Sequence, residues 1–355
     1  MYVLLFLTVR LSVSHWHPMW PPTDPAVQCP THWPTNILLM NSLVGNMCMP
    51  WTWYISCEFI FYLFAPLFLI GMHKNRKVCF FLSVSTILAS SLANAWTMHV
   101  YNFPPTPLVF TWNVPALKPS SLFNPNFMEQ HLIMYIKPWY RVGPYIVGLL
   151  LGYYLSELAR MEKPPRRSSR FMAIGWLASF VGAFWALFGV WPATQVCNLQ
   201  TTITQLIQFQ AYNWPIYHYV YGALHRTVFA ASFGFLIYAC QTERAQILNS
   251  VLGSRLLLPL SSLSYSVYLV HLIAIAFTYM WEPFPMWFTS KWPLFGHCLI
   301  QLFISYLMAG RVTLVAELPV LHIERILKQW ARQRNVDALN NNSANIKSVN
   351  VPQPI

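Results

Sequence analysis

The chain has 355 residues, of which 56% are hydrophobic and only 9% are charged, and its formal net charge is +12. A soluble globular domain usually carries about 25% charged residues, so this composition excludes an ordinary soluble protein. The basic residues lie in short clusters between apolar runs, which is typical of membrane topology and argues against nucleic-acid binding.

The N-terminal part of the sequence leaves two interpretations open. Residues 1–14 are apolar but too short to cross a bilayer, so they are either a signal peptide or the outer end of a partial transmembrane span. Residues 15–52 are expected to form an extracytoplasmic loop, in which Cys29 and Cys48 are the first candidates for a disulfide. Prolines interrupt the spacing of the histidines in this loop, so we predict no metal site there. These histidines are His15, His17 and His32.

Seven apolar runs follow, each close to the roughly 20 residues that a spanning helix needs. Their approximate ranges are 53–71, 78–98, 142–159, 172–191, 219–240, 260–281 and 294–316. The sequence therefore predicts an all-α polytopic transmembrane helix bundle, with seven full spans and a partial N-terminal one. We expect the membrane domain to cover residues 53–316.

The charges of the connections predict the orientation of the spans. Basic clusters occupy every second connection, beginning with Lys74–Lys77 and Arg160–Arg170 and ending with the tail at 317–355. The positive-inside rule places these connections and the C-terminus in the cytoplasm. Within the tail, residues 323–334 are typical of a basic amphipathic helix on the membrane surface, and the polar end is expected to be disordered. The longest outer connection, 99–141, is rich in aromatic residues and is expected to form a cap or lid.

Glu58 is the most informative single residue, because it is an ionisable side chain inside a predicted span. Such a residue is costly in a bilayer and is by default a functional-site hypothesis. The alternative is that Glu58 reaches interfacial water or pairs with a neighbour. Arg226, which follows His225, lies at a comparable depth from the same side, so an ion pair between Glu58 and Arg226 is a hypothesis.

Two other polar groups stand in or beside predicted spans. Tyr265, Tyr268 and His271 are spaced three residues apart and share roughly one side of a helix. They can shape a site, or they can form the interhelical hydrogen bonds that are common in membrane bundles. The run Lys137–Arg141 is interpreted as a set of interfacial anchors. No phosphate-binding loop or metal-ligand motif occurs.

The run Trp53–Leu67, with Glu58, the Phe61-Tyr62 pair and Pro66, resembles a hallmark helix of acyltransferase family 3, a family of integral membrane proteins. The run Leu263–His271 is similar to a second hallmark near the C-terminal end of that family. Three further stretches resemble its animal branch, called nose resistant to fluoxetine. They are Cys48–Trp53, Lys137–Gly152 and Glu317–Glu324.

The resemblance implies a bundle of about ten helices that transfers acyl groups from a thioester donor, usually acyl-CoA, to a lipid or small-molecule hydroxyl. No bound cofactor or metal is implied. The family's catalytic His lies in its first helix, and nothing in this chain aligns with that helix. We therefore expect this chain to correspond to a C-terminal portion of a family member. It has no identified catalytic residue, and whether it catalyses acyl transfer by itself is left open. Its supporting site candidates are Glu58, Tyr62, Arg226, Tyr265, Tyr268 and His271.

Two other classes of function compete with an acyltransferase. A carrier of lipids or xenobiotics would show uptake without an acylated product. A seven-span receptor would share the outside start and the inside tail, but the family resemblance and the intramembrane Glu58 argue against it. All three classes place the chain in the plasma membrane or an endomembrane, with the lipid bilayer as its partner.

Overall fold

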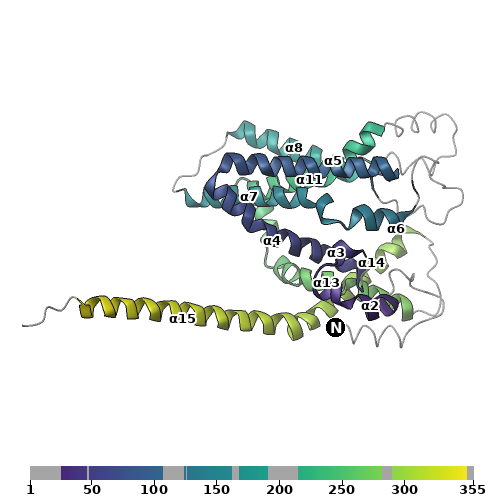
Figure 1. Ribbon diagram of the computed structural model, residues 1–355. Helices are drawn as coiled ribbons and strands as arrows, with labels where there is room; N and C mark the ends of the chain where they lie inside the picture. Colours follow the sequence, from purple (N-terminus) through teal and green to yellow (C-terminus); the bar gives the residue numbers. More distant parts are fainter. Residues whose placement is uncertain are drawn as a thin grey trace, which may run out of the picture. The chain divides into compact units, whose positions relative to one another are not determined.

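A computed structural model shows the chain as helices joined by connections of varied length (Figure 1). No strand occurs in the part of the chain that the structure describes, which confirms the predicted all-α fold. The described residues are 25–45, 48–106, 124, 126–161, 168–190, 215–281 and 290–349. The predicted partial span at 1–14, together with His15 and His17, lies outside them.

All seven predicted spans are helices that are long and apolar enough to cross a membrane. They are α4 (Trp53–Lys74), α5 (Arg76–Tyr101), α7 (Val142–Arg160), α8 (Ser169–Phe188), α11 (Pro215–Gln241), α13 (Leu257–Trp281) and α14 (Lys291–Val312). A single residue, Asn75, separates α4 from α5. Its side chain accepts a hydrogen bond from the Val78 amide at 3.3 Å and so caps α5, a role that Asn fills well.

The described helices form two compact units, one within residues 19–252 and the other within residues 253–355. The membrane domain that the sequence predicts over 53–316 stays a prediction, and its helices belong to both of these units. The division follows the packing, because α4, α5, α7, α8 and α11 pack on one another, while α13 packs on α14. A short helix, α12 (Gln246–Leu252), ends the first unit.

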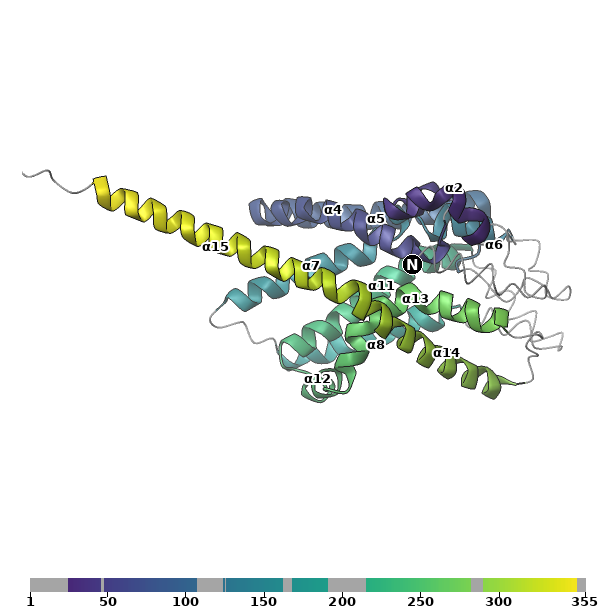
Figure 2. The ribbon, with the colours of Figure 1, turned by 90° about the horizontal axis from the view of Figure 1, so that it is seen from below.

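In the unit of residues 19–252, α11 is the central helix and packs on α5, α7 and α8 (Figures 1 and 2). The approach of α8 to α11 is close because small residues face one another. A Cβ added to Gly182 would lie 2.7 Å from Ser232 Oγ, and Ser179 Oγ donates a hydrogen bond to the Ser232 carbonyl at 2.6 Å. Small residues and hydroxyl hydrogen bonds commonly join helices in membranes.

The expected loop at 15–52 contains two helices, α2 (Pro25–Ile37) and α3 (Asn41–Val44). A disulfide joins Cys29 in α2 to Cys48, the pairing that the sequence analysis put first. The buried Asn36 side chain donates a hydrogen bond to Thr52 Oγ1 at 2.8 Å and accepts one from the Cys48 amide at 3.0 Å. These bonds fix α2 against the residues that lead into α4.

The connection at 99–141 folds back onto the bundle where the structure describes it, and residues 107–123 lie outside the described part. Phe103 and Met134 are buried together with Met98 of α5, and Gln130 Nε2 donates a hydrogen bond to the Pro104 carbonyl at 2.7 Å. The turns of this segment are α6 (Phe127–Gln130), the π-helical η4 (His131–Tyr135) and the 3₁₀ turn η5 (Pro138–Tyr140). They hold the residues that precede α7.

In the other unit, a π-helical turn joins α14 to α15 without a loop. The turn is η7 (Thr313–Glu317), and α15 covers Leu318–Val349. The Glu317 carboxylate accepts hydrogen bonds from Ser266 Oγ of α13 at 2.9 Å and from Thr313 Oγ1 at 3.3 Å. Two hydroxyl groups therefore tie this carboxylate between α13 and the end of α14.

The C-terminal tail continues α14 as one long helix. The basic stretch 323–334 is helical, and α15 continues to Val349. The disorder expected of the polar end stays a prediction. Residues 350–355 lie outside the described part.

Candidate functional site

A cavity of about 850 Å³ lies between α4, α7 and α11, within the unit of residues 19–252. Ligand pockets commonly have volumes of about 300–1,000 Å³, so this cavity can hold a sizeable small molecule. Most of its lining is apolar or aromatic, and three charged side chains interrupt it: Glu58, Arg141 and Arg226.

Arg141 reaches the cavity from the residue just before α7. Its guanidinium carbon lies 4.2 Å from the centroid of the Trp53 ring and 4.3 Å from that of the Tyr135 ring. Its Nε donates a hydrogen bond to the Tyr135 carbonyl at 2.5 Å, while its Nη2 is buried without a hydrogen-bond partner. Burial lowers the pKa of Arg141 from its usual range, but a guanidinium keeps its proton at neutral pH. From the sequence, Arg141 is interpreted as an interfacial anchor. In the structure its side chain lines the cavity.

Arg226 lies near the midpoint of α11 and lines the same cavity. Its guanidinium carbon lies 5.6 Å from the centroid of the Tyr135 ring, a cation–π contact. Within the described part of the chain Arg226 forms no hydrogen bond or ion pair, and its Nη1 is buried. An arginine at the centre of a spanning helix costs about 3 kcal/mol on insertion scales, so such a residue normally has a functional reason.

Glu58 is partly buried on α4 and lines the cavity together with Arg226. The two side chains thus share one site, but no ion pair joins them. The ion pairs among the described residues instead link Arg76 and Arg160 to Glu157, and Lys328 to Glu324. No Glu58–Arg226 ion pair is therefore formed, and both side chains line the cavity.

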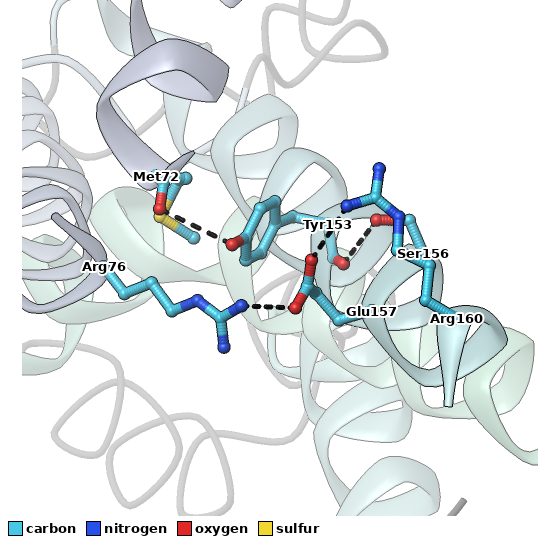
Figure 3. Close-up of polar contacts among 6 residues, drawn as sticks. All are labelled: Met72, Arg76, Tyr153, Ser156, Glu157 and Arg160. Atoms are coloured by element: carbon cyan, nitrogen blue, oxygen red, sulfur yellow. Dashed lines mark hydrogen bonds and ion pairs between the residues drawn. The ribbon is translucent and has the colours of Figure 1, made fainter. Parts of the chain in front are cut away.

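Tyr153 of α7 also lines the cavity, and Figure 3 shows its polar contacts. Its hydroxyl donates a hydrogen bond to the Met72 carbonyl at 3.5 Å, and the Arg76 guanidinium lies 5.6 Å from its ring centroid. Arg76 also forms an ion pair with Glu157, one turn beyond Tyr153. These contacts hold α4, α5 and α7 together.

Two glycines of α7 leave part of the cavity wall without side chains. A Cβ added to Gly148 or Gly152 would meet no atom within 4 Å, and both residues line the cavity. The groove along α7 is therefore open because these positions lack side chains. The neighbouring wall is apolar, with Phe61 of α4 and Leu149 of α7.

Two titratable side chains of the 99–141 connection lie beside this site. His131 stacks on Tyr135, with ring centroids 5.1 Å apart, and burial together with the nearby charge of Arg141 lowers the pKa of His131 to about 4. Lys137 Nζ donates a hydrogen bond to the Leu43 carbonyl at 2.7 Å, and burial lowers its pKa. At neutral pH His131 is therefore uncharged.

The remaining site candidates are not part of this cavity lining. Tyr62 is 73% exposed, although it follows Glu58 by one helical turn. Tyr265 is 53% exposed. His271 Nδ1 lies 2.7 Å from the Tyr268 carbonyl oxygen, so Nδ1 carries the proton and donates. Tyr265, Tyr268 and His271 belong to α13 in the other compact unit, where this bond ties His271 to its own helix.

No group of three or more potential metal ligands occurs among the residues that the structure describes. Of the candidate side chains, the structure brings together Glu58 and Arg226, and it adds Arg141. The sequence carries a signal for Arg141 in the aromatic residues near it, since cationic side chains stack on aromatic rings. It does not show which rings those are, because Trp53 lies far away in the chain.

Comparisons with known proteins agree with this architecture. The model of a family described as "Acyltransferase domain" matches residues 1–310. The chain is 25% identical to "Nose resistant to fluoxetine protein 6" of Caenorhabditis elegans over 341 residues, which is 94% of this chain and 39% of that protein. It is 28% identical to "Regulator of hypoxia-inducible factor 1" of the same organism over 146 residues, 39% of this chain and 28% of that protein.

The chain therefore spans well under half the length of these curated relatives. No solved structure matches it significantly. The family match covers most of the chain, including all the helices that form the cavity. With this match, and with seven apolar helices among the residues that the structure describes, the chain belongs to acyltransferase family 3 and is a multi-pass membrane protein.

Proposed function

We propose that this protein transfers an acyl group from a thioester donor, acyl-CoA, to a hydroxyl group of a lipid or small molecule. The observation that carries the proposal is the cavity between α4, α7 and α11, where Glu58 shares an otherwise apolar groove with two arginines. An apolar groove suits an acyl chain, and charged groups at one end suit the reacting head.

In this reaction the acceptor oxygen forms a bond to the thioester carbon, the carbon–sulfur bond breaks, and the hydroxyl proton passes to a base. Family resemblance implies a His as this base. Glu58 is proposed to orient the acceptor hydroxyl. The N–H groups of Arg141 and Arg226 are suited to stabilise the negative charge that develops on the carbonyl oxygen, which is a large term in acyl transfer.

The test is acyl transfer in membranes from cells that express the longest natural product containing this chain, because the chain spans 39% of its relative. We expect Glu58→Gln to lower the transfer rate by about tenfold or more, the loss typical of one charge-assisted hydrogen bond. Glu243→Gln is the control, since Glu243 is exposed and lies outside the cavity lining. Equal rates for the wild type and Glu58→Gln would remove Glu58 from the mechanism.

A carrier of lipids or xenobiotics is the second candidate. The observation that favours it is that no histidine is found among the described residues lining the cavity. A carrier predicts uptake of a labelled lipid by cells that make no acylated product from it. If an acylated product does form and depends on Glu58, the carrier hypothesis is rejected.

A further inference from the structure

Two positive charges of the cavity have no acidic partner in the described part of the chain. Arg141 and Arg226 both line it, each has a buried nitrogen without a hydrogen-bond partner, and neither forms an ion pair. Buried charges are normally paired, because an unpaired ion loses its hydration without compensation. An anion between the two guanidinium groups would supply the missing acceptors.

Aromatic rings hold the guanidinium groups but cannot satisfy their N–H donors in the way that an anion does. Arg141 lies over Trp53 and Tyr135, and Arg226 lies over Tyr135 as well. One Tyr135 ring therefore contacts both cations and brings two like charges into one neighbourhood. The arrangement suits a carboxylate or phosphate, whose several oxygens can accept from both guanidinium groups.

The rest of the cavity lining is mainly apolar and suits a hydrocarbon chain. Along α4 its lining runs from Tyr54 to Leu69, about 22 Å of helix, which is a large part of the roughly 30 Å hydrocarbon core of a bilayer. On α7 the missing side chains of Gly148 and Gly152 leave this path open. A ligand that fills the cavity therefore has a charged head and a long apolar tail.

We propose that the cavity between α4, α7 and α11 binds a single-chain anionic lipid, with its carboxylate or phosphate against Arg141 and Arg226 and its chain along Phe61 and Leu149. Glu58 then faces the head region, where it excludes a second negative charge. The proposal goes beyond the proposed function and does not depend on it, because binding itself needs no catalysis.

The test is photo-crosslinking in cell membranes, without any acyl donor, using three probes of equal chain length. The probes carry a photoreactive group in the chain and differ in the head: a fatty acid, a lysophosphatidic acid and a neutral fatty alcohol. We expect at least one of the anionic probes to label the protein about tenfold more than the neutral one, and the stronger of the two identifies the head group.

Arg226→Met and Arg141→Met should each lower labelling by the anionic probes by about tenfold and leave labelling by the neutral probe unchanged. Lys74→Met is the matched control, because it removes one exposed cation of α4 outside the cavity lining. A melting curve for each variant shows whether it is folded, and Arg226→Lys, which keeps the charge, should retain part of the preference.

Two outcomes would overturn the proposal: equal labelling by charged and neutral probes, or full anionic labelling in folded Arg226→Met and Arg141→Met proteins. These outcomes are independent of acyl transfer. If the protein binds the anionic probe but forms no acylated product, the lipid-binding proposal stands and the proposed acyltransferase function is rejected. If it acylates an acceptor but binds charged and neutral probes equally, the proposed function stands and the lipid-binding proposal is rejected.

Discussion

Protonation of His131 destabilises the folded protein. It stacks on Tyr135 beside Arg141, and its pKa is about 4 in the folded protein, below the ordinary value of about 6.5. The unfolded chain therefore binds more protons between these values, so the contribution of His131 to stability is complete above pH 6.5 and is lost as the pH falls toward 4. Lowering the pH from about 6.5 to about 5 should cost up to about 2 kcal/mol from this residue.

The measurement is the melting temperature of the purified protein as a function of pH, compared with that of His131→Phe. Phe keeps an aromatic ring against Tyr135 but cannot be protonated, so the variant should lose less stability on acidification. Parallel pH curves for the two proteins would show that His131 does not carry this effect.

The positions of single side chains were only partly predictable from the sequence. Glu58 and Arg226 were predicted to lie close because each lies at a similar depth in a span, and they do share one cavity. Their ion pair is not formed, because depth alone does not fix the direction of a side chain around a helix. Tyr62 is largely exposed for the same reason. Arg141 was not identified as a cavity residue, since its position depends on Trp53 and Tyr135, which only the folded chain brings together.

At the scale of elements, α7 controls the width of the cavity through its glycines. In Gly148→Leu the new Cβ meets no atom within 4 Å, and the substitution should improve helix propensity. The new side chain would nevertheless occupy the path of the chain. We expect acyl transfer, or labelling by the anionic probe, to fall about tenfold while the melting temperature is maintained.

Gly296→Leu provides the control for this substitution. Gly296 lies in α14, an added Cβ there also meets no atom within 4 Å, and the residue does not line the cavity. Its replacement should leave transfer and labelling unchanged. Full activity in the Gly148→Leu protein would mean that the ligand does not pass along α7.

The hydropathy pattern predicted the long helices better than it predicted the local geometry of the turns. The seven long helices follow from apolar runs of nearly 20 residues, a signal that a bilayer makes strong. The π-helical turns η4 and η7 could not be predicted, because one extra residue per turn leaves no clear mark on hydrophobic periodicity. The η4 turn carries both His131 and Tyr135, so the sequence did not predict the local backbone that places these two residues beside the cavity.

At the scale of the whole molecule, the charge pattern defines an orientation that can be tested. Basic residues near the α4–α5 connection and near the end of α7 lie at one end of the unit of residues 19–252, where Arg76 pairs with Glu157 (Figure 3). The positive-inside rule assigns this end to the cytoplasm. Because the spans alternate, we expect a C-terminal cytoplasmic tail.

An epitope tag at the C-terminus should therefore react with antibody only after the plasma membrane is permeabilised. A tag inserted between residues 107 and 123, in the longest outer connection, should react in intact cells if the protein reaches the cell surface. For a protein retained in internal membranes, protease protection of sealed vesicles gives the same comparison. The reverse pattern at both sites would invert the topology.

The bond between Cys29 and Cys48 has a consequence for how the protein matures. Disulfides form in oxidising compartments, so we expect the Cys29–Cys48 bond to form on the lumenal or extracellular side of the membrane. Closing a loop of 19 residues contributes about 3 kcal/mol, which a freshly inserted, still reduced chain lacks. A chain in which this bond is reduced therefore holds α2 less firmly, so a reducing agent should lower the melting temperature of the protein.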